Sequence, residues 1–537
     1  MIVPPRVGAR KTSRTKRCIG ASPRSNPRPS IKPPIPEPPP KKTQLPIDVL
    51  PPEVAALLAA MPPDQELPLE ILAPFVLQRV PLANACLTAW SYMLNSEFLG
   101  DLYERHRGRS YEDILTFPNI VELVRDALVL HKGSGRASLE RADEQEELPT
   151  CHGAFYGKLR RIPLGLSLGF MEECTERLRA LRPTGAWAEP LPASLAGMTV
   201  TIVDGKQIKN VAKRLLALRS KPGKIIGGKI LGIYVPAEGL VVAMAADRDG
   251  EANDVRLMPE AIRRANARIK GVKLWVADRQ FCDLNQPTIL TEQGHHFLFR
   301  RTMKMTFTAD SNRAHREAVD SQGRTVFEHW GWIGAEKEKR RRYVRQIHLI
   351  RPGQDDVYLL TDLLDENAYP ADDLLLVYLK RWDIERVFQK ITEVFGLQQL
   401  IGCSPEATIF QASFCMVLYN LLQLMCAFMA ASQKDLLAEA VSIEKLFEDV
   451  HRQLTTLVVL FPSAMIAGWY TVALSPEEVS RRRQILIGAS WARRYRKAVN
   501  KKPRPKVTKA KCSGAHISVQ KVLQAERKKQ RPAQGDR

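Results

Sequence analysis

Closely spaced cysteines are missing from this chain of 537 residues, which has nine cysteines in all. An odd, dispersed set without a C-x-x-C pair is typical of reduced thiols and not of a disulfide framework. The spacing also argues against a structural zinc site, which needs grouped ligands. No signal-peptide pattern opens the chain, because its early charged residues precede no apolar segment. These absences favour a cytoplasmic protein.

Long apolar runs are also scarce, and only residues 410–431 could cross a bilayer. Gln411, Asn420 and Gln423 interrupt this run, and no charge asymmetry marks its ends. We therefore expect a buried helix and no membrane partner.

Acidic residues are few at the two ends of the chain. Residues 1–46 carry a net charge of +10 and residues 480–537 one of +17, which leaves −5 of the total of +22 for the middle. Lys and Arg that neutralise phosphates release counterions, so these ends favour a nucleic-acid partner. The alternative is a solvated basic tail without a specific role.

Composition and periodicity divide the chain into five parts, because a chain of this length exceeds one ordinary core. Residues 1–46 hold twelve prolines and few large apolar groups, which predicts a disordered tail. The other parts are a helical N-terminal domain at 47–190 as a candidate for DNA contact, an α/β domain at 191–435 with a β-rich insertion at 301–354, a helical region at 436–485 and a basic tail at 486–537.

Strand and helix patterns alternate in the predicted α/β domain. Apolar runs predict strands at 198–204, 224–235, 240–246, 272–277 and 295–300, and helices at 254–269, 372–395 and 406–431. Three strands, a helix and a further strand is the order of a ribonuclease H-like mixed sheet with flanking helices.

Three acidic residues stand where this sheet could bring them together. Asp204 ends the first predicted strand, Asp278 ends another, and Glu385 lies on a long predicted helix. Three convergent carboxylates can hold two divalent ions, which can drive displacement at a phosphodiester. Each acid alone has a plainer explanation, since Asp204-Gly205 is also an ordinary turn dipeptide and Asp278 could cap a helix.

Tyr378, Arg381 and Glu385 share one face of the helix predicted at 372–395. At ~100° per residue they fall within roughly 60° of one another. Arg381 can bind a phosphate through two parallel N–H bonds, and Tyr378 can donate to a phosphate oxygen or stack on a base. The plain alternative is an Arg381–Glu385 ion pair on a solvated helix face.

The spacing Tyr378-x2-Arg381-x3-Glu385 resembles the C-terminal signature of insertion-sequence DDE transposases, in the group called IS-four. The segments around Asp204 and Asp278 are similar to the two aspartate regions of that family. The likeness covers about residues 150–430.

The resemblance implies a ribonuclease H-like fold and cut-and-paste transposition of an insertion sequence through its terminal inverted repeats. It implies double-stranded DNA as partner, both transposon ends and target, a homodimer in the synaptic complex, and a place in the bacterial cytoplasm with the nucleoid. The catalytic residues and ligands of two Mg²⁺ ions, with Mn²⁺ as a substitute, would be Asp204, Asp278 and Glu385, and the DNA contacts Tyr378, Arg381, Lys206 and Lys209.

One position departs from the family signature, which places a lysine where this chain has Thr392. Position 392 falls on the face of Glu385, whereas Lys390 does not, so one phosphate contact is missing. Lys206, Lys209 or a basic residue of the insertion could compensate. Two other functions stay open: a catalytically silenced DNA-binding copy, and a nuclease of the same fold.

Other residues compete for these roles. Asp362 follows a predicted strand and is the strongest rival ligand, whereas Asp383 faces away from Glu385. Trp330 or Trp332 of the insertion could hold an unstacked base. The remaining candidates are the rival acids Asp254 and Asp283, and the pair His295-His296, which we expect to be structural.

Overall fold

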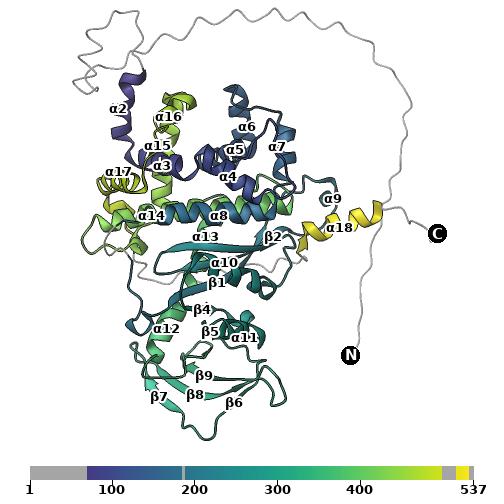
Figure 1. Cartoon of the computed structure of the whole chain (residues 1–537), viewed down its shortest axis with the longest axis vertical. Helices are drawn as coiled ribbons and strands as arrows, with labels where there is room; N and C mark the ends of the chain where they lie inside the picture. The colour runs from purple at the N-terminus through teal and green to yellow at the C-terminus, as the bar shows by residue number, and fades with distance from the viewer. Residues whose placement is uncertain (1–68, 184–187, 499–515, 531–537) are drawn as a thin grey trace, which may run out of the picture. The chain divides into compact units, whose positions relative to one another are not determined.

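A mixed sheet of 11 strands organises the part of the chain that the structure describes, residues 69–183, 188–498 and 516–530 (Figure 1). The structure is a computed structural model. The proline-rich segment predicted at 1–46 lies outside the described residues. The strand order is β11-β2-β1-β4-β5-β10-β9-β8-β6, with β3 on β2 and β7 on β8.

The strands are β1 Thr199–Lys209, β2 Ile225–Val235, β3 Leu240–Asp247, β4 Lys273–Ala277, β5 His296–Arg300, β6 Phe307–Ala309, β7 Arg316–Val319, β8 Thr325–Ile333, β9 Arg342–Leu349, β10 Val357–Thr361 and β11 Ile517–Ser518. The helices are α2 Leu69–Arg79, α3 Pro81–Met93, α4 Ser96–His106, α5 Phe117–Val129, α6 Gly135–Glu144, α7 His152–Leu159, α8 Leu164–Arg179, α9 Leu216–Arg219, α10 Met258–Arg268, α11 Asn285–Glu292, α12 Ala371–Leu379, α13 Trp382–Glu393, α14 Pro405–Ala431, α15 Ile443–Leu460, α16 Ser463–Gly468, α17 Pro476–Gly488 and α18 Val519–Gln530.

The strands predicted between 198 and 300 are confirmed, but β1 does not stop at Asp204. It runs on to Lys209, because β2 pairs with it across the Asp-Gly dipeptide, with Asp204 opposite Gly232 and Lys206 opposite Ile230. The alternative of a turn at Asp204-Gly205 is therefore wrong. Asp204 projects from the interior of a strand that has neighbours on both sides.

The helix predicted at 372–395 is interrupted. α12 ends at Leu379 and α13 begins at Trp382, and the Arg381 amide donates to the Tyr378 carbonyl at 3.0 Å, three residues back. This tight turn replaces the regular 3.6-residue repeat between Tyr378 and Arg381.

Helices cover both faces of the sheet, and the alternation along β4 shows it. Leu274 and Val276 belong to the hydrophobic cluster under α8 and α14, whereas Trp275 and Ala277 belong to the cluster under α10 and α11. Buried on both sides, the centre of the sheet is a rigid support for groups at its edge.

The helix α14 has the length and apolarity of a membrane span, but 89% of its most apolar window is buried inside the protein. Its polar side chains satisfy backbone groups: the Asn420 amide accepts from Val241 N at 3.0 Å and donates to Val241 O at 2.7 Å, on strand β3. Gln411 accepts from Ile401 N. The expected buried helix is confirmed, and the Asn420 amide covers an otherwise unpaired edge of β3.

The insertion predicted at 301–354 is β-rich, as expected, and β6 to β9 continue the sheet beyond β10 (Figure 1). At the other end, residues predicted to lie in a basic tail form β11 and α18 instead. The domain boundaries at 190 and 435 stay predictions, since helices on both sides of each share one hydrophobic cluster with the sheet.

Candidate active site

The two aspartates lie next to each other on neighbouring parallel strands. β1 and β4 pair in parallel with Ile202 opposite Val276, and two further residues in that register bring Asp204 level with Asp278. Asp278 follows the last residue of β4 with an extended backbone (φ −77°, ψ 172°). This register places the two aspartates at one edge of the sheet, and their catalytic role stays a prediction.

Glu385 reaches the same place from α13, because that helix packs on β1. Its Ile384 and Phe388 also lie at van der Waals distance from the Gly232 position of β2, where a Cβ would stand 3.4 Å and 3.5 Å from them. Arg381 Nη1 is 2.8 Å from Glu385 Oε1 and 3.6 Å from Asp204 Oδ2. The two carboxylates therefore lie well within one nanometre, bridged by one guanidinium.

Asp278 and Tyr378 form a more deeply buried part of the site. Asp278 Oδ1 and Tyr378 Oη are buried and have no hydrogen-bond partner among the described residues. Burial, offset in part by Arg381, raises the pKa of Tyr378 to about 12. Since Tyr378 is only 5% exposed, stacking on a base is not open to it, and donation from its hydroxyl remains.

A groove of about 630 Å³ runs along β1 and α13. Asp204, Glu385, Thr392, Lys206 and Lys209 all line it, so the predicted DNA contacts on β1 share a surface with two of the predicted catalytic acids. Asp278 is not among its lining residues, although Gln280, two residues on, is.

Lys206 and Lys209 differ in their surroundings. Lys206 Nζ lies 5.7 Å from the ring centroid of Phe388, and burial lowers the pKa of this lysine. Lys209 is exposed at the rim of the groove.

Asp254 is a site residue that sequence reasoning ranked too low. Its carboxylate lines the groove, is 4% exposed, and lies 2.5 Å from Lys229 Nζ. β3 runs parallel to β1 and β4, so an acid after β3 emerges at the same edge of the sheet as Asp278. That topology was the available signal.

Gly205 is required by the approach of Asp254. A Cβ at this position would stand 2.3 Å from the Asp254 carboxylate, closer than any real contact. Gly205 N also donates to Asp204 Oδ1 at 2.8 Å, so the same residue orients one acid and admits another.

We expect Gly205→Ala to destabilise the fold by about 1–3 kcal/mol through overpacking. Urea unfolding measures the change. Gly197→Ala is the control, because a Cβ there meets nothing within 4 Å. Equal free energies of unfolding for the two variants would show that Asp254 does not pack tightly against Gly205.

The rival acids are engaged elsewhere. Both oxygens of Asp362 are occupied, by His296 Nδ1 at 2.8 Å and Phe297 N at 2.9 Å. Asp383 pairs with Arg386, away from the groove, as predicted. Asp283 accepts from Asn285 N and Gln286 N at the start of α11.

Of the candidate histidines and tryptophans, three have structural contacts and one stays open to a ligand. His295 bonds Asn266 and His296 bonds Asp362, which confirms their structural role. Trp330 is 2% exposed and donates to Leu364 O, so it cannot hold a base. Trp332 is 38% exposed and stays a candidate.

Asp204 is costly to ionise in this setting. Burial raises its pKa to about 6, the Gly205 amide and Arg381 oppose that shift, and Glu385 and Asp254 add to it. Mutual repulsion among Asp204, Glu385 and Asp254 is the mark of a site that needs added positive charge.

The raised pKa predicts how stability depends on pH in the metal-free protein. Because the folded-state pKa of about 6 exceeds the ordinary value of 3.8, the folded state binds the proton more tightly. The stability contributed by Asp204 is therefore full below about pH 4 and is lost as pH rises to about 6. Relative to Asp204→Asn, the native protein should lose on the order of 2–3 kcal/mol between these limits.

Urea unfolding in the presence of a chelator, across pH 4 to 7.5, measures this difference. Asp204→Asn should be the more stable protein at neutral pH. Parallel pH profiles for the two proteins would mean that Asp204 is not desolvated.

The carboxylates suit a hard divalent cation in chemistry, but they are not gathered in advance. Within 69–183, 188–498 and 516–530 no three His, Cys, Asp or Glu side chains stand close enough to hold an ion. Arg381 lies between Asp204 and Glu385. Oxygen-only donors and the unpartnered Asp278 Oδ1 nevertheless fit Mg²⁺ or Mn²⁺.

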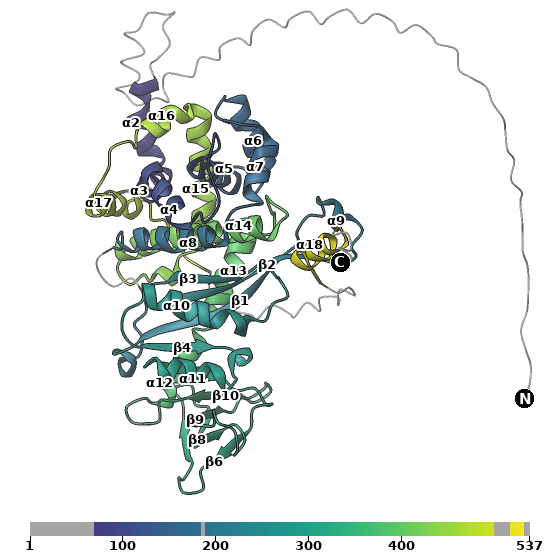
Figure 2. The same ribbon diagram turned by 45° about the vertical axis from the view of Figure 1, so that its right-hand side comes forward.

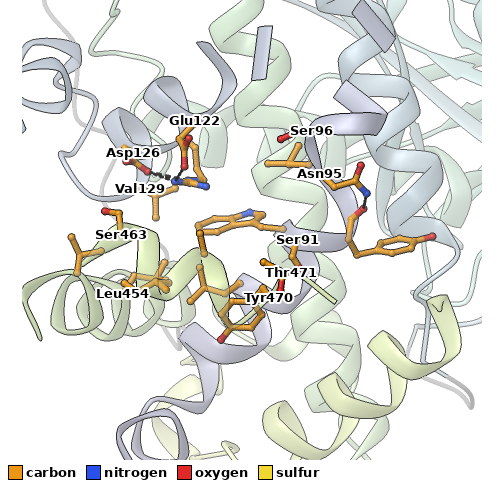
Figure 3. A pocket seen from close by; sticks show the side chains of 18 of the residues that line it. Ser91, Asn95, Ser96, Glu122, Asp126, Val129, Leu454, Ser463, Tyr470 and Thr471 are labelled. Carbon is orange, nitrogen blue, oxygen red and sulfur yellow. Dashed lines mark hydrogen bonds and ion pairs between the residues drawn. The ribbon is translucent and has the colours of Figure 1, made fainter. Parts of the chain in front are cut away.

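A second hollow, about 540 Å³, lies among α3, α5, α15 and α16 (Figure 3). Several of its charged groups neutralise one another: Arg125 pairs with Glu122 and Asp126, and Arg141 also pairs with Asp126. Much of the remaining lining is apolar, with Val129, Leu454 and Tyr470 among it.

Residues 195–421 match the protein family described as Transposase DDE domain. The matched segment contains Asp204, Asp278 and Glu385, and the match supports a DDE transposase. No curated protein matches the chain. Among solved structures the chain is similar to one titled "Cryo-EM structure of piggyBac transposase synaptic complex with hairpin DNA (SNHP)", with 10% identity, a TM-score of 0.28, and coverage of 85% of this chain and 83% of that chain. A likeness of that degree says nothing further about this chain.

Proposed function

We propose that the chain is a DNA transposase of an insertion sequence of the IS-four group. It would bind the terminal inverted repeats of its element and carry out metal-dependent strand cleavage and transfer by a cut-and-paste route. One observation carries the proposal: Arg381 joins Asp204 to Glu385 in a groove, with Asp278 in register beside Asp204.

The strand order supports the predicted ribonuclease H-like domain. β3-β2-β1-β4-β5, with β2 antiparallel and β4 and β5 parallel to β1, is the order expected of that fold. The insertion β6–β9 falls between Asp278 and Glu385 in sequence, as the resemblance requires.

The three acids act together in the proposed chemistry. Asp204, Asp278 and Glu385 would hold the divalent ions. The positive charge of such ions would lower the pKa of an attacking hydroxyl and stabilise negative charge on a leaving oxygen. Oδ1 of the half-buried Asp278 is shielded from solvent and would be held in position for a ligand role.

Arg381 would exchange partners during the reaction. Its guanidinium is 4% exposed and now compensates Asp204 and Glu385. With Glu385 holding a cation, the Arg381 fork would be free to bind a phosphate of the DNA strand. Tyr378 Oη, also without a partner among the described residues, would donate to the same phosphate group.

The proposal includes a homodimer that bridges two transposon ends and acts in the bacterial cytoplasm. Its test is a cleavage assay on supercoiled DNA that carries the element's own ends. Cut ends that join a new target support the proposal. Scission without joining indicates a nuclease of the same fold.

A second candidate, a DNA-binding copy that no longer cuts, is favoured by Thr392. This residue lines the groove with Glu385, and its hydroxyl donates back to Phe388 O at 2.6 Å. Lys390 pairs with Glu444 and so does not replace the missing cation. Binding without any scission would select this candidate.

We expect Thr392→Lys to tighten DNA binding and raise cleavage about tenfold, because it returns one charged hydrogen bond to the groove. Binding and cleavage assays on the same duplex measure the change. Thr455→Lys, at an exposed position of α15, adds the same charge elsewhere and is the control. An equal gain in both variants would point to net charge alone.

A further inference from the structure

The loop that joins β1 to β2, residues 209–224, is a strongly basic surface next to the groove. It contains six Lys or Arg and no Asp or Glu. Lys209, Lys213, Arg214, Arg219 and Lys224 are exposed. A short segment that starts at the rim of the groove therefore carries six positive charges and no negative one.

Carboxylates do not neutralise the charge of this segment, in contrast to the arginines of α15 and α17. Arg481 and Arg482 on α17 pair with Glu478, and Arg452 on α15 pairs with Asp449. In the described part of the chain, none of the six loop cations forms an ion pair with a carboxylate. Lys213 instead donates to the Lys221 carbonyl of the same loop, and Arg214 donates to the Ile401 carbonyl.

The C-terminal segment holds this loop in place. β11 pairs in parallel with Ile225 and Ile226, where β2 begins, and Ile517 N donates to Lys224 O at 3.1 Å. α18 packs against α9 within the loop, and the two helices lie side by side in both views (Figures 1 and 2). Val519 is fully buried, and Val522 is 6% exposed.

A polar contact strengthens the anchor. Glu251, after β3, accepts from Ser518 N at 2.9 Å and pairs with Lys521 of α18. Gly250 O, next to it, accepts from Gln207 of β1 at 3.0 Å. The C-terminal segment is therefore tied to the groove wall as well as to the basic loop.

We propose that residues 209–224 and α18 form one DNA-binding lobe that holds the phosphate backbone of the duplex beside the strand being cut. The inference rests on the proposed function, since DNA is its substrate. The groove itself is lined by Asp204, Asp254, Glu385 and Glu393, which repel a polyanion. A neighbouring cationic surface supplies the sequence-independent attraction that this acidic centre lacks.

The test is duplex-DNA binding by the full chain as a function of salt concentration. Lys213→Ala/Arg219→Ala/Lys224→Ala should weaken binding at least about tenfold and lower the slope of log K against log salt by about 2 to 3. The loss should be equal on element ends and on unrelated duplex, because phosphates carry no sequence. Arg452→Ala/Arg481→Ala/Arg482→Ala removes the same charge elsewhere and should leave the slope unchanged.

A second variant tests the anchor without changing charge. Val519→Ser/Val522→Ser should also weaken duplex binding, by roughly threefold or more, while the circular dichroism spectrum stays native. If the slope of log K against log salt is unchanged in the loop variant, or equal in the loop and control variants, residues 209–224 do not bind the DNA backbone. Unchanged binding by the anchor variant would overturn the role of α18. Neither readout requires cleavage, so a native protein that binds but does not cut contradicts the proposed function and leaves this result intact.

Discussion

Asp204→Asn, Asp278→Asn and Glu385→Gln should each lower strand cleavage by at least ~10³-fold, on the scale seen when an essential catalytic group is removed. Binding of the transposon ends should stay within about threefold of the native value, because phosphate contacts and not these acids supply the attraction. A gel-based cleavage assay and a binding isotherm on the same DNA measure the two effects.

The controls are acids that share the surroundings but not the site. Asp383→Asn lies on the same helix as Glu385 but pairs with Arg386, and Asp362→Asn follows a strand as Asp278 does but bonds His296. Both should keep cleavage within a fewfold of native. Retained cleavage in any of the three site variants would remove that residue from the proposed ligand set.

Arg381→Ala should lower cleavage about 10²- to 10³-fold, comparable to loss of one preorganised donor in a desolvated site. The variant leaves Asp204 and Glu385 without the cation that now bridges them. Arg381→Lys should recover little, because an ammonium group cannot span two carboxylates or hold a phosphate with two parallel bonds.

Arg386→Ala on the same helix is the matched control for Arg381. Its side chain is 73% exposed and pairs only with Asp383, so cleavage should remain near native. Single-turnover cleavage rates separate the variants. A rate for Arg381→Ala within threefold of that of Arg386→Ala would contradict the assigned role.

The sequence predicted the strands of the central sheet because buried strands are apolar runs bounded by turns. β2, β3, β4 and β5 all begin and end within about two residues of the predicted positions. The pairing of Asp204 with Asp278 followed from the order of strands, since neighbouring parallel strands deliver their acids to one edge. β1 was cut short because Asp204-Gly205 is also a common turn.

Other features of the site could not be predicted from local sequence patterns. Asp254 and Gly205 are far apart in the sequence and meet only in the folded chain, so no local sequence pattern predicts their contact. The turn at Arg381 carries no proline or glycine, so nothing in the sequence marks the break between α12 and α13. β11 has only two residues and lies in a basic segment, so it is too short to show the alternating apolar and polar pattern of a strand.

The sequence predicted which side chains meet at the site better than it predicted how they pair there. The helix pattern placed Arg381 and Glu385 together, and they are together, but as an ion pair that holds the carboxylates apart from a ready metal site. Propensity and spacing report which side chains can meet. The Arg381–Glu385 ion pair was the plain alternative that the spacing allowed, and it is present, although Arg381 is buried and does not lie on a solvated face.

The central claim, that these carboxylates bind catalytic divalent ions directly, is tested most directly by a change of ligand at Asp278. Asp278→Cys should lose cleavage in Mg²⁺, because a thiolate is a poor ligand for a hard cation, and should regain at least about tenfold of it in Mn²⁺, which accepts sulfur more readily. The native protein should cleave in both metals. Cleavage by Asp278→Cys in Mg²⁺ at the native rate would contradict the claim.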